Sequence, residues 1–302
     1  MTKRLAGPVT YPGGKGNLVK KILPHIPYTK IYCEPFGGGA SVLINREKSE
    51  IEVYNDIDGL LVNLFRVFQS PLKTSKLQRR LDYTLFSRDE FKQAIEILRN
   101  KKENSSEITL AWAYFTVMNQ CFCGNTVDSV RVSNWSRTFT SDRTRKWNYR
   151  INCLGDWLNR LLRVNIDNDC ALKVIKYWDS PDTTFYLDPP YVLDTRMKGI
   201  YSHEQEDNFH EKLIDLIVSC QGAITLSGYE HPIYNRLDDS GWERFEIETF
   251  NFMSREKSGE RSSRTEILWK NPMAIQLLNK PSKNSFFSLF IDENSFDNDE
   301  QS

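Results

Sequence analysis

Histidine and cysteine are scarce in this 302-residue chain, and long apolar runs are missing. No stretch approaches the roughly 20 consecutive apolar residues that a membrane helix requires, and the first residues carry charge without the apolar core of a secretory signal. We therefore expect a cytoplasmic protein with no membrane partner. Disulfides are disfavoured in that compartment, so we expect ordinary thiols at Cys33, Cys121, Cys123, Cys153, Cys170 and Cys220.

The same scarcity argues against a metal centre and against a covalent nucleophile. Cys121 and Cys123 form a C-x-C pair, but no second Cys or His pair stands at zinc-ligand spacing. The four histidines are dispersed along the chain. No G-x-S-x-G elbow is present, and no cysteine has the setting of an activated thiolate. We expect no metal cofactor.

Two glycine-rich motifs lack residues that their best-known functions require. Gly14-Lys15 suggests a P-loop, but Val9 stands at the required earlier glycine, and Lys15 is followed by another glycine instead of Ser or Thr. Gly37-Gly38-Gly39 suggests a dinucleotide fingerprint, but Val42 stands at its last glycine position. Phosphate-binding loops of these two kinds are therefore excluded.

Basic charge is concentrated in one segment. The formal net charge is zero, which by itself does not favour a nucleic-acid partner. Between residues 131 and 150, however, six basic residues accompany one acid, whereas the tail 285–302 has five acids and no base. By composition alone, a solvated face and a phosphate-binding surface explain the basic segment about equally well. We expect the acidic tail to be disordered.

Strand and helix patterns alternate in two parts of the chain, as in a doubly wound, mostly parallel α/β sheet. Between them, residues 67–162 read as helices with aromatic and basic loops. We therefore predict a catalytic domain made of residues 1–66 and 163–275, with 67–162 as an inserted, mainly helical domain. Strands are expected at 30–36, 50–56, 164–166, 183–191 and 222–229, an antiparallel hairpin at 244–252 with 265–271, and helices at 17–26, 40–47, 58–69, 172–178 and 208–220.

Chemistry-bearing residues follow the expected strands of the catalytic domain. In open α/β sheets ligands bind at the carboxyl ends of strands, so these motifs should face one crevice. Glycines allow a ligand to approach the backbone closely, and an acid after the next strand can accept hydrogen bonds from both hydroxyls of a ribose. This pattern predicts a nucleoside site, built from Tyr11-Pro12-Gly13-Gly14-Lys15, Glu34-Pro35-Phe36-Gly37-Gly38-Gly39, Tyr54-Asn55-Asp56-Ile57-Asp58 and Asp188-Pro189-Pro190-Tyr191.

In their order and wording, these motifs resemble those of the Dam-like, alpha-group adenine-specific DNA methyltransferases. The resemblance extends to Ser227-Gly228-Tyr229 and to Arg264–Asn271, which is similar to the closing strand of that family. It implies a Rossmann-like methyltransferase sheet, S-adenosylmethionine as methyl donor, double-stranded DNA as partner, and a monomer or weak dimer. Each motif alone is weak, but the complete ordered set is specific.

The resemblance also implies roles for individual residues. The cofactor and the adjoining target pocket would be lined by Tyr11, Lys15, Glu34, Phe36, Gly37, Gly39, Asp56 and Asp188. The catalytic motif would be Asp188, Pro189, Pro190 and Tyr191. The inserted domain is where this family keeps target recognition, which turns the basic segment into a predicted DNA-binding surface with Arg131, Arg137, Arg143, Arg145 and Lys146.

This chain departs from the family pattern at two places. The family often has an acid just before the helix expected at 172–178, whereas Asp169-Cys170-Ala171 places it one position earlier, and we assign Asp169 no role. The family's GATC signature is not evident in Asn119–Asn125, so the recognition sequence stays open. The setting, in a restriction–modification system, a phage or a solitary regulator, also stays open.

The tetrapeptide Asp188–Tyr191 suits methylation of a planar amino group. The lone pair of such a nitrogen is delocalised, and acceptors placed out of the ring plane favour the pyramidal nitrogen that attacks a methyl group. Successive prolines hold a carbonyl in place, and Tyr191 offers a face for stacking. A base in a duplex would have to be flipped out. Alternatives are a methyltransferase acting on cytosine, RNA or protein, and a catalytically inactive DNA-binding relative.

Overall fold

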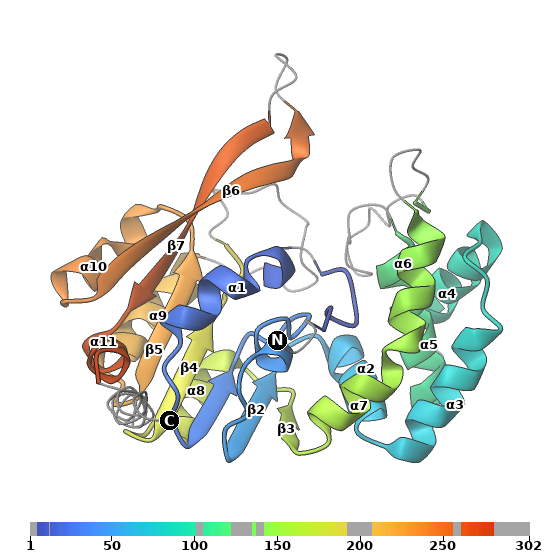
Figure 1. Ribbon diagram of the computed structural model, residues 1–302, viewed down its shortest axis with the longest axis horizontal. Helices are drawn as coiled ribbons and strands as arrows, with labels where there is room; N and C mark the ends of the chain where they lie inside the picture. Colours follow the sequence, from blue (N-terminus) through green and yellow to red (C-terminus); the bar gives the residue numbers. More distant parts are fainter. Residues whose placement is uncertain are drawn as a thin grey trace, which may run out of the picture.

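The computed structural model describes residues 5–11, 13–100, 105–121, 135–136, 142–191, 207–255 and 261–280. A seven-stranded sheet of order β3-β2-β1-β4-β5-β7-β6 forms the centre of the molecule (Figure 1). Strands β1 to β5 are parallel, and β7 runs antiparallel to both β5 and β6. The strands are β1 Ile31–Glu34, β2 Ile51–Asn55, β3 Val164–Asp167, β4 Thr183–Leu187, β5 Ala223–Gly228, β6 Glu243–Arg255 and β7 Arg261–Lys270.

The predicted doubly wound α/β sheet and its closing antiparallel hairpin are therefore confirmed. Strands β4 and β5 are buried throughout, as expected for parallel strands covered on both faces. One apolar core packs α8 and α9 against the sheet, and a second contains α2 and the helices of the inserted segment. The helices outside the inserted segment are α1 Val19–Ile22, α2 Gly59–Phe68, α8 Ala171–Trp178, α9 Asp207–Val218, α10 Asn235–Asp239 and α11 Pro272–Leu278.

The inserted segment folds into a group of helices beyond the β3 edge of the sheet (Figure 1). Its central helix, α5, is buried on nearly every side, and Ser106 caps its first turn through Thr109 N–H. The predicted boundary at residue 67 lies inside α2, whose side chains share one core with α5. The helices are α3 Pro71–Asp82, α4 Arg88–Asn100, α5 Glu107–Gln120, α6 Arg143–Asn152 and α7 Leu154–Leu161.

The helix predicted for residues 40–47 is wrong. The structure has only a 3-10 turn, η3, at Leu43–Asn45, and the chain becomes extended at Arg46. Side-chain hydrogen bonds end the turn, because the Asn45 amide donates to the carbonyls of Ser41 and Leu5. The helix predicted for 17–26 is likewise reduced to the single turn α1 between 3-10 turns at Lys15–Asn17 and Leu23–His25.

The helix predicted to start at Asp58 is confirmed. The Asp58 carboxylate accepts hydrogen bonds from the N–H groups of Leu60 and Leu61, at 2.9 and 3.3 Å. Such a cap satisfies donors that the first helical turn leaves unpaired. It also fixes the point where β2 ends, which places Asp56 at the carboxyl edge of the sheet.

Candidate active site

A pocket of about 310 Å³ opens at the carboxyl ends of the parallel strands, which is within the usual size range of small-molecule sites. Segments that are far apart in sequence meet there: the N-terminal loop, the loop after β1, the loop after β2 and the end of β4. The pocket lining includes all the residues predicted for the cofactor, Tyr11, Lys15, Glu34, Phe36, Gly37, Gly39, Asp56 and Asp188, together with Pro190.

The glycine loop after β1 is held against the end of β2. Gly38 N–H donates to the Asp56 carboxylate at 2.8 Å, and the Tyr54 hydroxyl donates to the Gly38 carbonyl at 2.8 Å. Gly38 has a φ of 47°, in the left-handed region that favours glycine. A Cβ on Gly37 would lie 2.1 Å from Tyr54 Cε2. The loop can therefore follow the pocket wall only with glycine at these positions.

Asp56 is buried beneath the glycine loop. Burial raises the pKa of its carboxyl to about 6, although hydrogen bonds from the N–H groups of Asp58 and Gly38 oppose that shift. Asp58 in turn accepts a hydrogen bond from the Tyr114 hydroxyl of α5 at 2.9 Å. The inserted segment thus supports the acid side of the pocket through a buried side chain.

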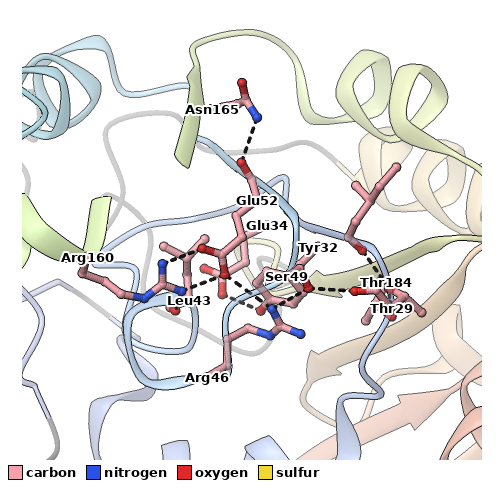
Figure 2. Close-up of polar contacts among 11 residues, drawn as sticks. Thr29, Tyr32, Glu34, Leu43, Arg46, Ser49, Glu52, Arg160, Asn165 and Thr184 are labelled. Carbon is pink, nitrogen blue, oxygen red and sulfur yellow. Dashed lines mark hydrogen bonds and ion pairs between the residues drawn. The ribbon is translucent and has the colours of Figure 1, made fainter. Parts of the chain in front are cut away.

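Glu34 forms the floor of the pocket at the end of β1. It accepts a hydrogen bond from the Tyr32 hydroxyl at 2.6 Å (Figure 2), and Arg46 lies over the Tyr32 ring. Burial raises the pKa of Glu34 to about 8, against the opposing effects of Tyr32 and the nearby arginines. Burial thus favours the protonated form of this carboxyl.

Lys15, which is buried, and Asp188, which is partly exposed, form an ion pair in the pocket lining. The Lys15 ammonium lies 2.6 Å from Asp188 Oδ1 and donates to the Tyr191 hydroxyl at 2.7 Å. Burial would lower the pKa of Lys15, but Asp188 and Glu266 outweigh it and raise that pKa well above its usual value. Burial raises the pKa of Asp188 to about 6, with Lys15 opposing the shift.

Tyr191 is buried beside the pocket, and neither it nor Pro189 belongs to the lining. Its ring stacks on Tyr229, with ring centroids 4.1 Å apart. The predicted tetrapeptide therefore splits into two parts: Asp188 and Pro190 line the pocket, and Tyr191 anchors the turn behind it.

Sequence reasoning did not single out three residues that line this pocket or contact its wall. Tyr186 stands two positions before Asp188 and lines the pocket; its position in the period-2 pattern of β4 was the available signal. Glu266 of β7 contacts Lys15 and Tyr191, and the Ser227 hydroxyl of β5 donates to Glu266. Their only sequence signal was their place in motifs shared with the family.

The start of α8 completes the pocket wall. Asp169, Cys170 and Ala171 line it. Asp169 N–H donates to the Asn55 side chain at 2.9 Å, while its carboxylate accepts from Cys170 N–H and from the Lys173 ammonium. The segment that departs from the family pattern therefore still lies at the site.

The inserted helices hold the N-terminal segment 6–8, which leads into the pocket. Three consecutive carbonyls there accept side-chain hydrogen bonds: Trp157 donates to Ala6 at 3.0 Å, Arg150 to Gly7 at 3.4 Å and Asn119 to Pro8 at 3.1 Å. On its other side, a Cβ on Gly7 would lie 2.8 Å from the Gly39 carbonyl oxygen. Chain segment 6–8 is thus confined between the inserted helices and the glycine loop.

The predicted DNA-binding residues on α6 differ in their exposure to solvent. Arg145 and Lys146 are exposed, whereas Arg143 is half-buried. Burial lowers the pKa of the neighbouring Arg150 to about 10, and Arg143 adds to that effect. Arg131, Arg137 and the tail 285–302 lie outside the described residues.

Within the described ranges, no group of His, Cys, Asp and Glu side chains could hold a metal ion, and no helix is long and apolar enough to cross a membrane.

The sheet order, the glycine loop and the acid after β2 define a Rossmann-like methyltransferase fold with its pocket at the strand ends. The chain belongs to the D12 class N6 adenine-specific DNA methyltransferases, whose family model matches residues 11–254.

Two further proteins show similarity to this chain. The modification methylase StsI of Streptococcus sanguinis is 25% identical over 202 residues, which cover 64% of this chain and 30% of that protein. The chain thus spans less than a third of that relative's length. A crystal structure from Pyrococcus horikoshii, provisionally described as an RNA methyltransferase, shares 11% identity over 41% of this chain and 67% of its own, with a TM-score of 0.20. That score is too low to bear on fold or function.

Proposed function

We propose that this chain transfers the methyl group of S-adenosylmethionine to the exocyclic amino group of adenine in duplex DNA. One observation carries the proposal: Asp188, an acid well suited to accept an amino hydrogen, lines the same pocket as the glycine loop and Asp56. A nucleoside site and an amino-group acceptor therefore share one enclosed space. Membership of the adenine-specific family supports adenine as the base.

The residues present fit the methyl donor. The glycine loop forms a cradle without side chains, and Asp56 offers carboxylate oxygens that can accept ribose hydroxyls. Tyr11, Lys15, Glu34 and Phe36 would enclose the rest of the molecule. When bound, S-adenosylmethionine supplies an electrophilic methyl group, and the pocket needs no phosphate-binding loop.

The chain's own groups would orient the target amino nitrogen. Asp188 and the Pro189 carbonyl can each accept one of its two hydrogens, drawing them out of the ring plane as the nitrogen becomes pyramidal. Tyr191, which packs against Tyr229 behind the pocket lining, would hold the turn that carries Asp188 and the Pro189 carbonyl. Because a paired base cannot reach this pocket, we propose that the target adenine is flipped out of the duplex.

Acceptor assays with labelled cofactor test this function directly. Duplex DNA, RNA and protein would be offered in parallel, and the modified base would be identified by mass spectrometry of nucleosides. We expect label only in duplex DNA, as N6-methyladenine. Label in cytosine, RNA or protein alone would overturn the proposal. Sequencing the methylated DNA would then give the recognition sequence.

Gly37→Ala is expected to weaken cofactor binding by at least about 100-fold, because its methyl group would overlap the Tyr54 ring and push the loop into the pocket. Calorimetric titration with S-adenosylmethionine measures the effect. Gly155→Ala is the matched control, since a Cβ there meets nothing within 4 Å. Unchanged binding in the Gly37 variant would contradict the assigned cofactor site.

The exposed basic residues of α6 are proposed to contact DNA phosphates. Replacing both Arg145 and Lys146 with alanine should flatten the plot of log affinity against log salt by about 1.8, since each phosphate contact contributes about 0.9 to its slope. Fluorescence anisotropy at several salt concentrations measures this slope. Replacing the exposed Lys176 and Lys212, which lie on α8 and α9, removes the same charge and should leave it unchanged.

A further inference from the structure

A buried carboxylate that the proposed mechanism does not use lies behind the turn Asp188–Tyr191, which we call the catalytic turn. Glu266, on β7, is only 2% exposed. Its Oε2 accepts a hydrogen bond from the Tyr191 hydroxyl at 3.0 Å, and its Oε1 accepts one from the Ser227 hydroxyl. The Lys15 ammonium lies 3.3 Å from Oε1. Glu266 does not line the pocket; it contacts Lys15, which does, and Tyr191 and Ser227, which do not.

The hydrogen bonds run in one direction, from Lys15 through Tyr191 to Glu266. Lys15 donates to the Tyr191 hydroxyl oxygen at 2.7 Å, so the hydroxyl hydrogen of Tyr191 is left to point at Glu266. The same ammonium donates to Asp188 at 2.6 Å and to the Gly13 carbonyl at 3.4 Å. One cation is thus shared between two carboxylates, one in the pocket wall and one behind it.

The charge balance explains what the second carboxylate does. With Asp188 as its only partner, the Lys15 ammonium would be drawn entirely to the oxygen that has to accept the amino hydrogen of the base. Glu266 attracts the same ammonium from behind and repels the Asp188 carboxylate, opposing that capture. In a site from which water is excluded, such interactions are strong.

We propose that Glu266 is a positioning residue for methyl transfer. By holding the Lys15 ammonium, it leaves an Asp188 oxygen available to accept the amino hydrogen of the base. By holding the Tyr191 hydroxyl, it fixes the orientation of the Tyr191 ring. Ser227 supports it by fixing Oε1. The inference rests on the proposed function, since it assigns Glu266 to the turn that would orient the target adenine. Glu266 acts through Lys15 and Tyr191 and does not contact the base.

Glu266→Gln tests the inference, because glutamine keeps the shape and can still accept from Tyr191 but removes the charge. We expect the single-turnover rate at its high-pH plateau to fall about 30-fold, while cofactor affinity changes by less than about threefold. Glu266→Asp retains the charge and should recover a substantial part of the rate. Glu243→Gln is the matched control, since Glu243 pairs with Lys270 at 2.9 Å on the neighbouring strand.

The pH profile separates positioning from simple damage to the fold. The Glu266 charge raises the pKa of Asp188, so removing it should lower that pKa and move the acidic limb of the rate profile to lower pH. A loosened structure would slow the reaction without this shift. A plateau rate within about threefold of the unaltered protein, or an unshifted limb, would overturn the inference.

A measurement without turnover keeps this inference distinct from the proposed function. Carbon-13 NMR of labelled aspartate carboxyls, with the Asp188 resonance assigned through Asp188→Asn, follows the Asp188 titration in the free protein. Glu266→Gln should lower its midpoint, and Glu243→Gln should not. An unmoved midpoint overturns the role of Glu266. Failure to methylate adenine in DNA, with the midpoint moving as expected, overturns the proposed function instead.

Discussion

Replacing Asp188 with alanine is expected to slow methyl transfer by at least about 10³-fold, as when a group that stabilises the transition state is removed from a preorganised site. The carboxylate is the side-chain acceptor that the pocket offers beside the catalytic turn. The fold should survive, because the Lys15 ammonium keeps Glu266 within 3.3 Å and is not left unpaired. Single-turnover assays with saturating cofactor and DNA measure the rate.

Asp188→Asn sharpens the same experiment. Its amide keeps the shape of the side chain but turns one acceptor into a donor, which would face another donor on the target base. Its activity should therefore be as low as that of the alanine variant. Asp182→Asn, an exposed aspartate just before β4, should leave the rate unchanged. Methyl transfer that survives both Asp188 variants would disprove the assigned mechanism.

The positions of the site motifs could be predicted because each follows a strand. Asp56 and Asp188 come directly after buried β segments, and parallel strands bring their carboxyl ends to one edge. The Asp58 cap was equally readable, since an acid just before an apolar helical stretch is a local signal. Such features depend on neighbours in sequence, and the structure retains them.

Partners that approach across the fold could not be predicted in this way. Glu266 reaches Lys15 only because β7 runs antiparallel to β5, with Ser227 opposite Leu268 and Gly228 opposite Ile267. This register is not encoded near either residue. The helix expected at 40–47 was wrong for a related reason. The alternation of strands and helices favoured it, but Arg46 instead contacts Tyr32 and Glu52.

The predicted domain boundary at residue 67 stays a prediction. Wherever the boundary is drawn, hydrogen bonds cross it between the inserted helices and the rest of the chain. Trp157 of α7 donates to the Ala6 carbonyl, and Tyr114 of α5 donates to Asp58. Both bonds connect the inserted helices to segments that lead into the pocket. If DNA is recognised on these helices, as proposed, recognition takes place next to the proposed cofactor site.

The strongest of these connections predicts the largest loss of stability. Arg160 of α7 forms a two-point ion pair with Glu52 of β2, at 2.5 and 2.8 Å, and also donates to the Leu43 carbonyl (Figure 2). Both side chains are almost fully buried. Arg160→Met would leave Glu52 with only the more distant Arg46, at 3.5 Å. We expect the free energy of unfolding to fall by about 3–5 kcal/mol, measured by urea denaturation.

A matched surface pair separates burial from charge pairing as such. Arg236 and Asp215 also form an ion pair, at 2.7 Å, but both are more than half exposed, so Arg236→Met should cost less than about 1 kcal/mol. The double variant Arg160→Met with Glu52→Gln removes the uncompensated charge and should regain at least half of the lost stability, because an unpaired buried carboxylate is the larger penalty. If the losses in unfolding free energy of the Arg160→Met and Glu52→Gln single variants simply added in the double variant, the ion pair would not be what connects α7 to β2.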